Sequence, residues 1–286
     1  NGGLNEAYMG MGYKIKGFSF GENWGYAFGN SNINTKRIII NDTVAYQSAR
    51  YADETFFSNF FYNIGIQYEH ALKNNLLLCV GASGSGEQKL HATRNIIRES
   101  FQHSSVYGDI PIDTIYIKNA ELGNVVNPLT YNIGFMLAKL TQDRNNNRVP
   151  QWKLGMEYSS TQWSRYRFYD TKDPVNDSWM WRVGGELIPN ALSTKSYWGS
   201  ISYRAGFYYG KDYINTSGPM KTYAFTAGLS FPIRRWNSYS YQFTQLNTAF
   251  EIGKRGNNEN IISENFFKFT LGICLSDIWF KRYKYN

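Results

Sequence analysis

Large apolar residues alternate with small or polar residues over long stretches of this chain. The clearest stretch runs from Gly17 to Gly29, and similar stretches cover about 222–233 and 267–276. The apolar face of the first stretch is formed by Phe18, Phe20, Trp24, Tyr26 and Phe28. Side chains of a β-strand repeat with period two, so one face of each stretch favours hydrocarbon and the other favours water or close packing.

This pattern predicts an all-β fold, and specifically a transmembrane antiparallel β-barrel with an apolar outside and a polar inside. Aromatic residues make up 17% of the chain, yet its mean hydropathy is only −0.47. A barrel can display such residues to lipid and concentrate them at the two membrane interfaces. No stretch approaches eighteen consecutive apolar residues, which excludes a transmembrane helix. A soluble sandwich or barrel is the alternative, but the polar face here is mostly Gly, Ser, Asn and Thr rather than Lys and Glu.

Eleven strands are visible in the sequence, and the connections between them alternate between short and long. The predicted strands cover about 5–15, 17–29, 56–71, 76–93, 128–140, 151–163, 178–188, 197–211, 221–234, 241–254 and 265–279. The most extended connections, about 30–55, 94–127 and 164–177, are predicted to be extracellular loops, because outer-membrane barrels have short periplasmic turns and longer outer loops. The β-branched run 110–117 could form a hairpin within the second loop.

The alternation of connections also sets the direction of the chain. It makes the last strand descend, so the C-terminus is expected in the periplasm. It makes the first strand descend as well, which indicates that an odd number of strands precedes residue 1. We interpret residues 1–286 as a single barrel domain whose N-terminal strands lie outside this sequence.

The charge and the cysteines add little. The net charge is +8, but the basic residues are scattered along the chain, which argues against a nucleic-acid partner and suits contacts with lipid headgroups. Cys79 and Cys274 lie on the polar faces of distant predicted strands, so we interpret them as small fillers rather than a disulfide.

No catalytic residue, metal ligand or cofactor motif can be assigned. The chain has three histidines, and none lies in a nucleophile motif. The acidic and amide-rich run at 143–147 lacks the carboxylate spacing of a calcium loop. We therefore expect a protein that is not an enzyme and that carries no cofactor.

Two sets of strand residues are the candidate site. Ionisable residues on the polar faces should point into the lumen, because a charge facing lipid costs about 2–4 kcal/mol at the membrane midplane. These lumenal candidates are Lys153, Glu157, Arg182, Glu186, Arg204, Glu251 and Lys268. They could brace a filled lumen as cross-strand pairs or line a polar track for a permeant. The residues predicted to face lipid are Phe18, Phe20, Trp24, Phe225, Leu229, Phe269, Leu271 and Ile273.

Several stretches resemble outer-membrane barrels of Bacteroidota related to the FadL/TodX transporters of hydrophobic compounds. They are the C-terminal run 267–286, the runs 202–210 and 223–235, and the runs 63–68 and 89–94. The resemblance implies a 14-stranded barrel plugged by an N-terminal hatch, which here would lie before residue 1. These motifs are strand patterns, so no gating residue can be transferred.

The resemblance favours a passive outer-membrane channel for small hydrophobic molecules in a Gram-negative bacterium. The alternative is a barrel that does not transport and serves as a subunit of a larger outer-membrane complex for secretion or outer-membrane protein assembly. The first hypothesis requires an apolar pocket and a hydrophobic ligand. The second requires a large contact with other outer-membrane proteins. Both require membrane lipid around the barrel.

Overall fold

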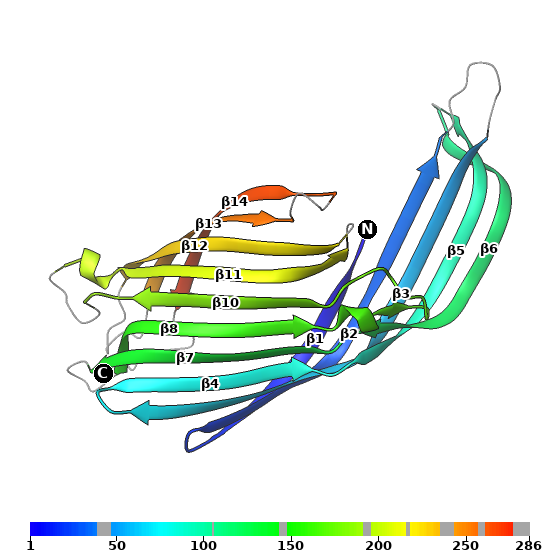
Figure 1. Cartoon of the computed structure of the whole chain (residues 1–286). Helices are drawn as coiled ribbons and strands as arrows, with labels where there is room; N and C mark the ends of the chain where they lie inside the picture. Colours follow the sequence, from blue (N-terminus) through cyan, green and yellow to red (C-terminus); the bar gives the residue numbers. More distant parts are fainter. Residues whose placement is uncertain are drawn as a thin grey trace, which may run out of the picture.

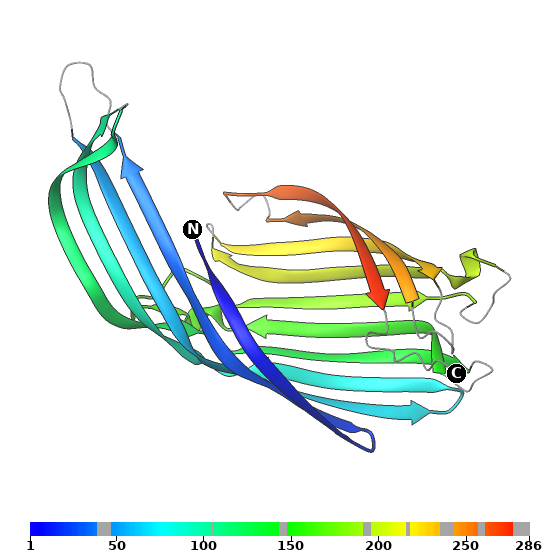
Figure 2. The same ribbon diagram turned by 180° about the vertical axis from the view of Figure 1, so that it is seen from behind.

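The fold is a single antiparallel sheet of fourteen strands that curves into an open trough (Figures 1 and 2). The structure is a computed structural model. It describes residues 1–38, 47–104, 106–142, 148–190, 196–215, 218–234, 243–256 and 261–276. Two single-turn 3₁₀ helices, η1 (Trp163–Arg165) and η2 (Trp198–Ser200), are the only helices in these residues.

Eleven strands form the wall of the trough, and each overlaps one of the eleven predicted strands. They are β1 (Gly2–Ile15), β2 (Phe18–Arg37), β3 (Ser48–Leu72), β4 (Leu76–Ser85), β7 (Thr130–Gln142), β8 (Arg148–Thr161), β10 (Ser178–Leu187), β11 (Ser202–Asn215), β12 (Pro219–Arg234), β13 (Phe243–Arg255) and β14 (Glu264–Ser276). Each is antiparallel to its neighbour in this order. The predicted all-β class is confirmed.

The remaining strands, β5 (Gln88–Ser104), β6 (Gly108–Asn127) and β9 (Arg167–Phe168), correct the prediction. The segments expected to be loops at 30–55 and 94–127 are mostly strand, and the hairpin suggested within 94–127 is the β5–β6 hairpin. The predicted strand 76–93 is divided between β4 and β5. Only residues 39–46 of the first predicted loop lie outside the described residues.

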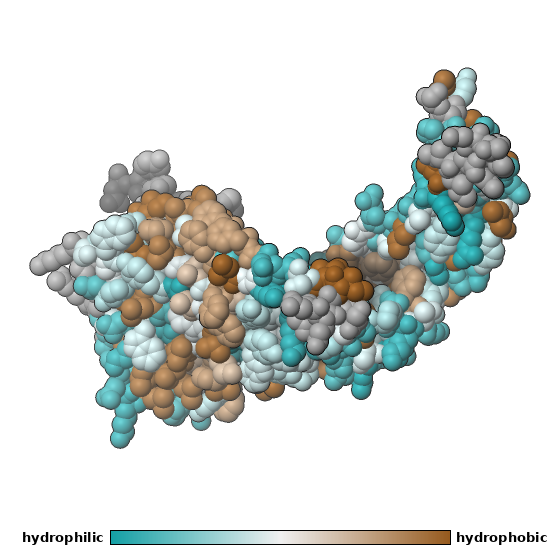
Figure 3. All heavy atoms as spheres, turned by 45° about the horizontal axis from the view of Figure 1, so that its top comes forward, coloured by the Kyte–Doolittle hydropathy of each residue, from teal (hydrophilic) through white to brown (hydrophobic). Residues whose placement is uncertain are grey.

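These extra lengths form a second structure, which we call the blade: residues 30–37 of β2, 48–58 of β3, and 91–124 of β5 and β6. About 9–11 residues of strand cross a bilayer, whereas β2 has 20 residues and β3 has 25. Figure 1 shows the blade rising at an angle from one end of the trough. Figure 3 shows hydrophobic residues gathered over the trough and mostly hydrophilic residues over the blade.

The blade and the trough separate at a fork in β3. Ile64 to Leu72 pair with β4, whereas Ser48 to Ser58 pair with β5. Two side-chain amides replace ladder bonds at the fork: Asn59 donates to the Lys89 carbonyl, and Gln88 donates to the Tyr62 carbonyl at 2.9 Å. Buried or membrane-level backbone groups need such partners, so these amides allow one strand to belong to two sheets.

The trough is not closed within the described residues, because β1 and β14 are the two edges of its wall. Ten antiparallel steps separate these edges, so β1 and β14 run in the same direction. No helix in the described residues is long and apolar enough to cross a membrane. The predicted periplasmic C-terminus concerns residues 277–286, which lie outside the described part.

A charge placed on the outer face of β14 should be far more harmful than the same charge one residue away. Leu271 is 60% exposed on the face that also carries Phe269 and Ile273. We expect Leu271→Arg to destabilise the barrel by about 2–4 kcal/mol, because the guanidinium would face lipid. Urea unfolding in lipid vesicles measures this loss. Thr270→Arg is the matched control, and equal damage from both variants would contradict the assignment of faces.

Candidate functional site

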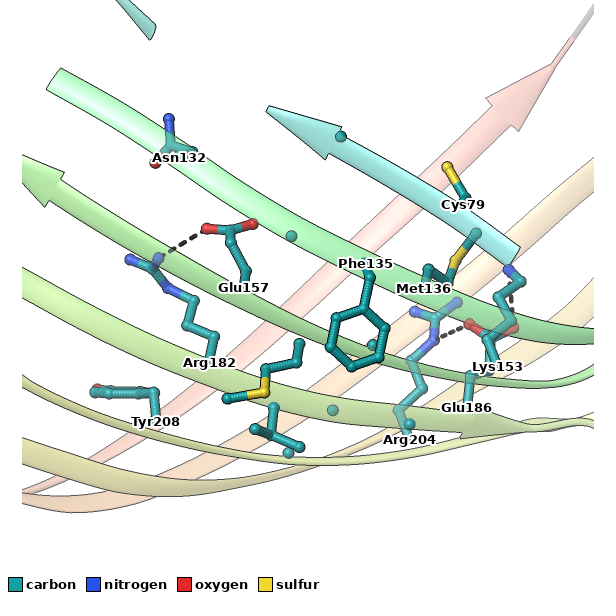
Figure 4. A pocket seen from close by; sticks show the side chains of 18 of the residues that line it. Cys79, Asn132, Phe135, Met136, Lys153, Glu157, Arg182, Glu186, Arg204 and Tyr208 are labelled. Atoms are coloured by element: carbon teal, nitrogen blue, oxygen red, sulfur yellow. Dashed lines mark hydrogen bonds and ion pairs between the residues drawn. The ribbon is translucent and has the colours of Figure 1, made fainter. Parts of the chain in front are cut away.

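The inner wall of the trough carries a row of paired charges across β8, β10 and β11. Lys153, Glu186 and Arg204 are direct cross-strand neighbours. The Glu186 carboxylate lies 3.1 Å from Arg204 Nε and 3.7 Å from Lys153 Nζ (Figure 4). One acid therefore balances two bases, and its side chain is the least exposed of the three.

A second row of polar contacts crosses the same inner wall, four residues away from the first row on each strand. Arg182 Nη1 lies 2.9 Å from both the Glu157 carboxylate and the Ser159 hydroxyl. The Tyr208 hydroxyl, opposite Arg182 on β11, donates to Glu251 at 2.7 Å. This row extends the polar contacts from β8 to β13.

Glycines separate the two rows. Gly155, Gly184 and Gly206 are direct neighbours on β8, β10 and β11. A Cβ at Gly206 would lie 2.8 Å from the Thr226 hydroxyl, so a larger side chain would require this group to move. All three line a cavity of about 1220 Å³ on the inner side of the wall.

The structure brings most of the predicted lumenal residues together. Six of the seven line this cavity: Lys153, Glu157, Arg182, Glu186, Arg204 and Glu251. Lys268 is not among the lining residues but lies opposite Glu251 in the β13–β14 register. Of the residues predicted to face lipid, seven are exposed, namely Phe18, Phe20, Trp24, Phe225, Phe269, Leu271 and Ile273, and Leu229 is half-buried.

The base of the blade contains a polar clasp that the sequence did not reveal. Arg94 of β5 binds Asp53 of β3 through two nitrogens, with its Nε at 2.9 Å from the carboxylate. Thr55 donates to the same carboxylate at 3.1 Å, and Tyr51 lies 3.4 Å from it. Asp53 is only 6% exposed, so its charge depends on these partners.

Electrostatics in the clasp favour the ionised form of Asp53. Burial on its own would raise the pKa of this carboxyl group, but the hydrogen bonds and positive charge of Arg94 lower it below its ordinary value. Hydrogen bonds from Thr55 and Tyr51 act in the same direction. The clasp is therefore a charged pair at neutral pH.

The segment after β8 covers the clasp. The rings of Phe168 and Tyr169 lie 5.5 and 5.6 Å from the Arg94 guanidinium. Phe168 pairs with Val125 of β6, and the Tyr169 hydroxyl donates to the Glu121 carbonyl at 2.9 Å. These aromatic residues also pack against a small apolar cluster of Ala27, Leu90, Ala92 and Val125. The segment predicted as a loop at 164–177 thus fixes the blade to the trough.

The alternation of Tyr51, Asp53, Thr55 and Phe57 was the signal that could have revealed the strand beneath the clasp. Arg94 is 41 residues away from Asp53, and their pairing follows only from the fold. Within the described residues, no group of three or more His, Cys, Asp or Glu side chains could hold a metal ion.

The whole chain, residues 1–286, matches the family model described as BamG. No curated protein matches the chain. The match does not support the resemblance to the FadL/TodX transporters.

Removing the shared acid of the first charged row should weaken the wall slightly. Glu186→Gln leaves Lys153 and Arg204 facing each other without a counter-charge. Because both bases are partly exposed, we expect a loss of about 1 kcal/mol in unfolding free energy, measured by urea unfolding in vesicles. Glu6→Gln is the control, since Glu6 of β1 makes no ion pair in the described part of the chain. Equal effects of the two variants would exclude a bracing role for Glu186.

Breaking the clasp should loosen the blade and not the trough. We expect Asp53→Asn to destabilise the blade by about 1.5–3 kcal/mol, because hydrogen bonds to a charged partner are lost. Hydrogen exchange of residues 91–124 reports this change. The lowered pKa of Asp53 means that its stabilisation is present above the ordinary value near 3.8 and is lost as the pH falls through the lower folded value. Glu54→Gln, on the opposite face, should leave exchange unchanged, and a pH response that survives in Asp53→Asn would contradict the assignment.

Proposed function

Because the chain belongs to the BamG family, we propose that it is a β-barrel subunit of the outer-membrane protein assembly machinery. The observation that carries this proposal is the match of the family model to all 286 residues. This was the alternative hypothesis drawn from the sequence. The first hypothesis, a passive channel for hydrophobic molecules, has no support from the family match.

The blade supports a role in protein contacts. It extends the sheet well beyond the length needed to cross a bilayer, and its base is fixed by the Asp53–Arg94 clasp and by Tyr169. A stable protein contact buries more than about 1,000 Å² in total. A rigid four-stranded sheet outside the membrane can offer a surface of this size without losing much conformational entropy on binding.

The inner wall of the trough is braced by contacts that are compatible with this role. One row of ion pairs crosses the wall from β8 to β11, and a second row of polar contacts crosses it from β8 to β13. Such rows brace a sheet from within and require no ligand.

The proposal includes a location and an orientation. The protein would lie in the outer membrane of a Gram-negative bacterium, with the blade on the outer side and the turns between β1 and β2 and between β3 and β4 in the periplasm. The C-terminus would then be periplasmic. Its partners would be other assembly subunits and membrane lipid, and it would act without catalysis or a cofactor.

Affinity purification from native membranes tests this proposal. The tagged full-length protein, extracted in a mild detergent, should retain other subunits of the assembly machinery. Its depletion should lower the amounts of many unrelated folded β-barrels in the outer membrane. An unrelated outer-membrane barrel with the same tag is the control. A protein that purifies alone, and whose depletion affects only the uptake of hydrophobic compounds, would overturn the proposal.

A further inference from the structure

A groove crosses the outer face of the sheet where the blade leaves the trough. Its volume is about 920 Å³. Two adjacent cross-strand rows form it. The lower row is Asn5, Phe28, Ser58, His91 and Asn124, on β1, β2, β3, β5 and β6. The upper row is Asn30, Phe56, Thr93 and Leu122, on β2, β3, β5 and β6.

The groove lies at the upper limit of the apolar band. Directly below it, the rings of Tyr26 and Phe60 contact each other with centroids 5.3 Å apart, and the Tyr26 hydroxyl points upward to Ser58 at 2.9 Å. Tyrosine in this arrangement is typical of the membrane–water interface. Above the groove, the outer face of β2 continues with Asn32, Asn34 and Lys36. The groove therefore lies at the depth of the lipid headgroups.

The lining combines two kinds of chemistry. Phe28, Phe56 and Leu122 are exposed apolar side chains on this outer face, and Leu122 is 81% exposed. Beside them stand the amides of Asn5, Asn30 and Asn124, which can each donate and accept hydrogen bonds. No lining residue is acidic, so an anionic group is not repelled there. Lys89, two residues before His91 in β5 and outside the groove lining, is exposed and adds a positive charge near it.

We propose that this groove binds the headgroup of an outer-leaflet glycolipid. The sugar hydroxyl and amide groups would bond to the three asparagine amides, and the apolar sugar faces would rest on Phe28 and Phe56. The acyl chains would continue downward over Tyr26 and Phe60, along the apolar band. Continuity with that band favours lipid over a protein partner, because the groove opens directly onto the surface that lipid covers. The inference rests on the orientation proposed above and is independent of the assembly role.

Native mass spectrometry of the full-length protein tests the site. The protein in mild detergent is titrated with purified lipopolysaccharide and, in a parallel arm, with phosphatidylglycerol. We expect lipopolysaccharide to bind at least about ten-fold more tightly, a difference worth about 1.4 kcal/mol. Asn30→Leu and Asn124→Leu should each weaken its binding by about five-fold, the loss of one neutral hydrogen bond.

Asn34→Leu is the matched control, because it makes the same change on the same face of β2 above the groove. It should bind lipopolysaccharide as the unchanged protein does. Heat-modifiable gel mobility verifies that every variant is folded. Equal binding of the two lipids, an equal loss in Asn34→Leu, or no loss in both groove variants would overturn the proposal. The proposal would also be overturned if a Phe56→Cys variant cross-linked to a protein rather than to lipid in native membranes. These experiments measure lipid binding and cross-links at residue 56. They do not depend on copurification of the assembly subunits, so the lipid site can be disproved while the proposed function still holds.

Discussion

The need to pair every backbone N–H and C=O group in lipid governs this structure. Hydrocarbon offers no hydrogen-bond partner, so a strand in the membrane must be paired on both sides. Pairing fixes the register, and the register fixes which side chains face inward, because a slip of one residue would exchange the two faces. The wall ladders run without a break through the middle of the trough, and shifts occur only near the ends of some pairs, such as Lys211–Asn215, Pro232–Arg234 and Lys139–Leu140. Because β1 and β14 run in the same direction, antiparallel closure of the wall requires an odd number of strands between them.

The same constraint explains why the fork in β3 is built as it is. Between Ser58 and Ile64, β3 leaves one partner and takes another, which exposes backbone groups near the membrane interface. Asn59 and Gln88 supply side-chain bonds at this point. Beyond the fork, in the blade, the strand pairing is less regular. There β6 contains three register shifts against β5, including one at Ile115. Such bulges twist an edge and protect it from pairing with another chain.

The sequence predicted the wall well and the blade poorly, for a physical reason. In the wall, lipid and lumen impose opposite demands on successive residues, so Phe267 to Leu275 alternate cleanly. In the blade, the run from Asn30 to Arg37 contains a single apolar residue, Ile33, and so carries no apolar alternation. The inward direction of Glu157 and Arg182 followed from period alone, but the contact between Tyr208 and Glu251 skips a strand and required the fold. Strand patterns are also shared by different families of barrels, which is why they suggested FadL/TodX and did not reveal the BamG family.

The fork also determines where the outer surface changes character. Below it, the outer faces of β2 and β3 carry mainly aromatic rings, among them Tyr26 and Phe60, and the last of these rings, Phe28 and Phe56, line the groove. The Ser58–His91 pair is the lowest rung of the blade and belongs to the groove. Polar side chains can appear on the outer face from this rung upward because the strand there no longer contacts the hydrocarbon of the bilayer. The exchange of partners in β3 thus places an aromatic belt, an amide-lined groove and a water-exposed sheet in sequence along one strand.

On the inner face the same rungs carry Phe57 and Ala92, which pack under Phe168 and Tyr169. The clasp and the groove are therefore two faces of one junction, and a substitution that tilts the blade at Asp53 acts on the outer groove through the shared strands β3 and β5.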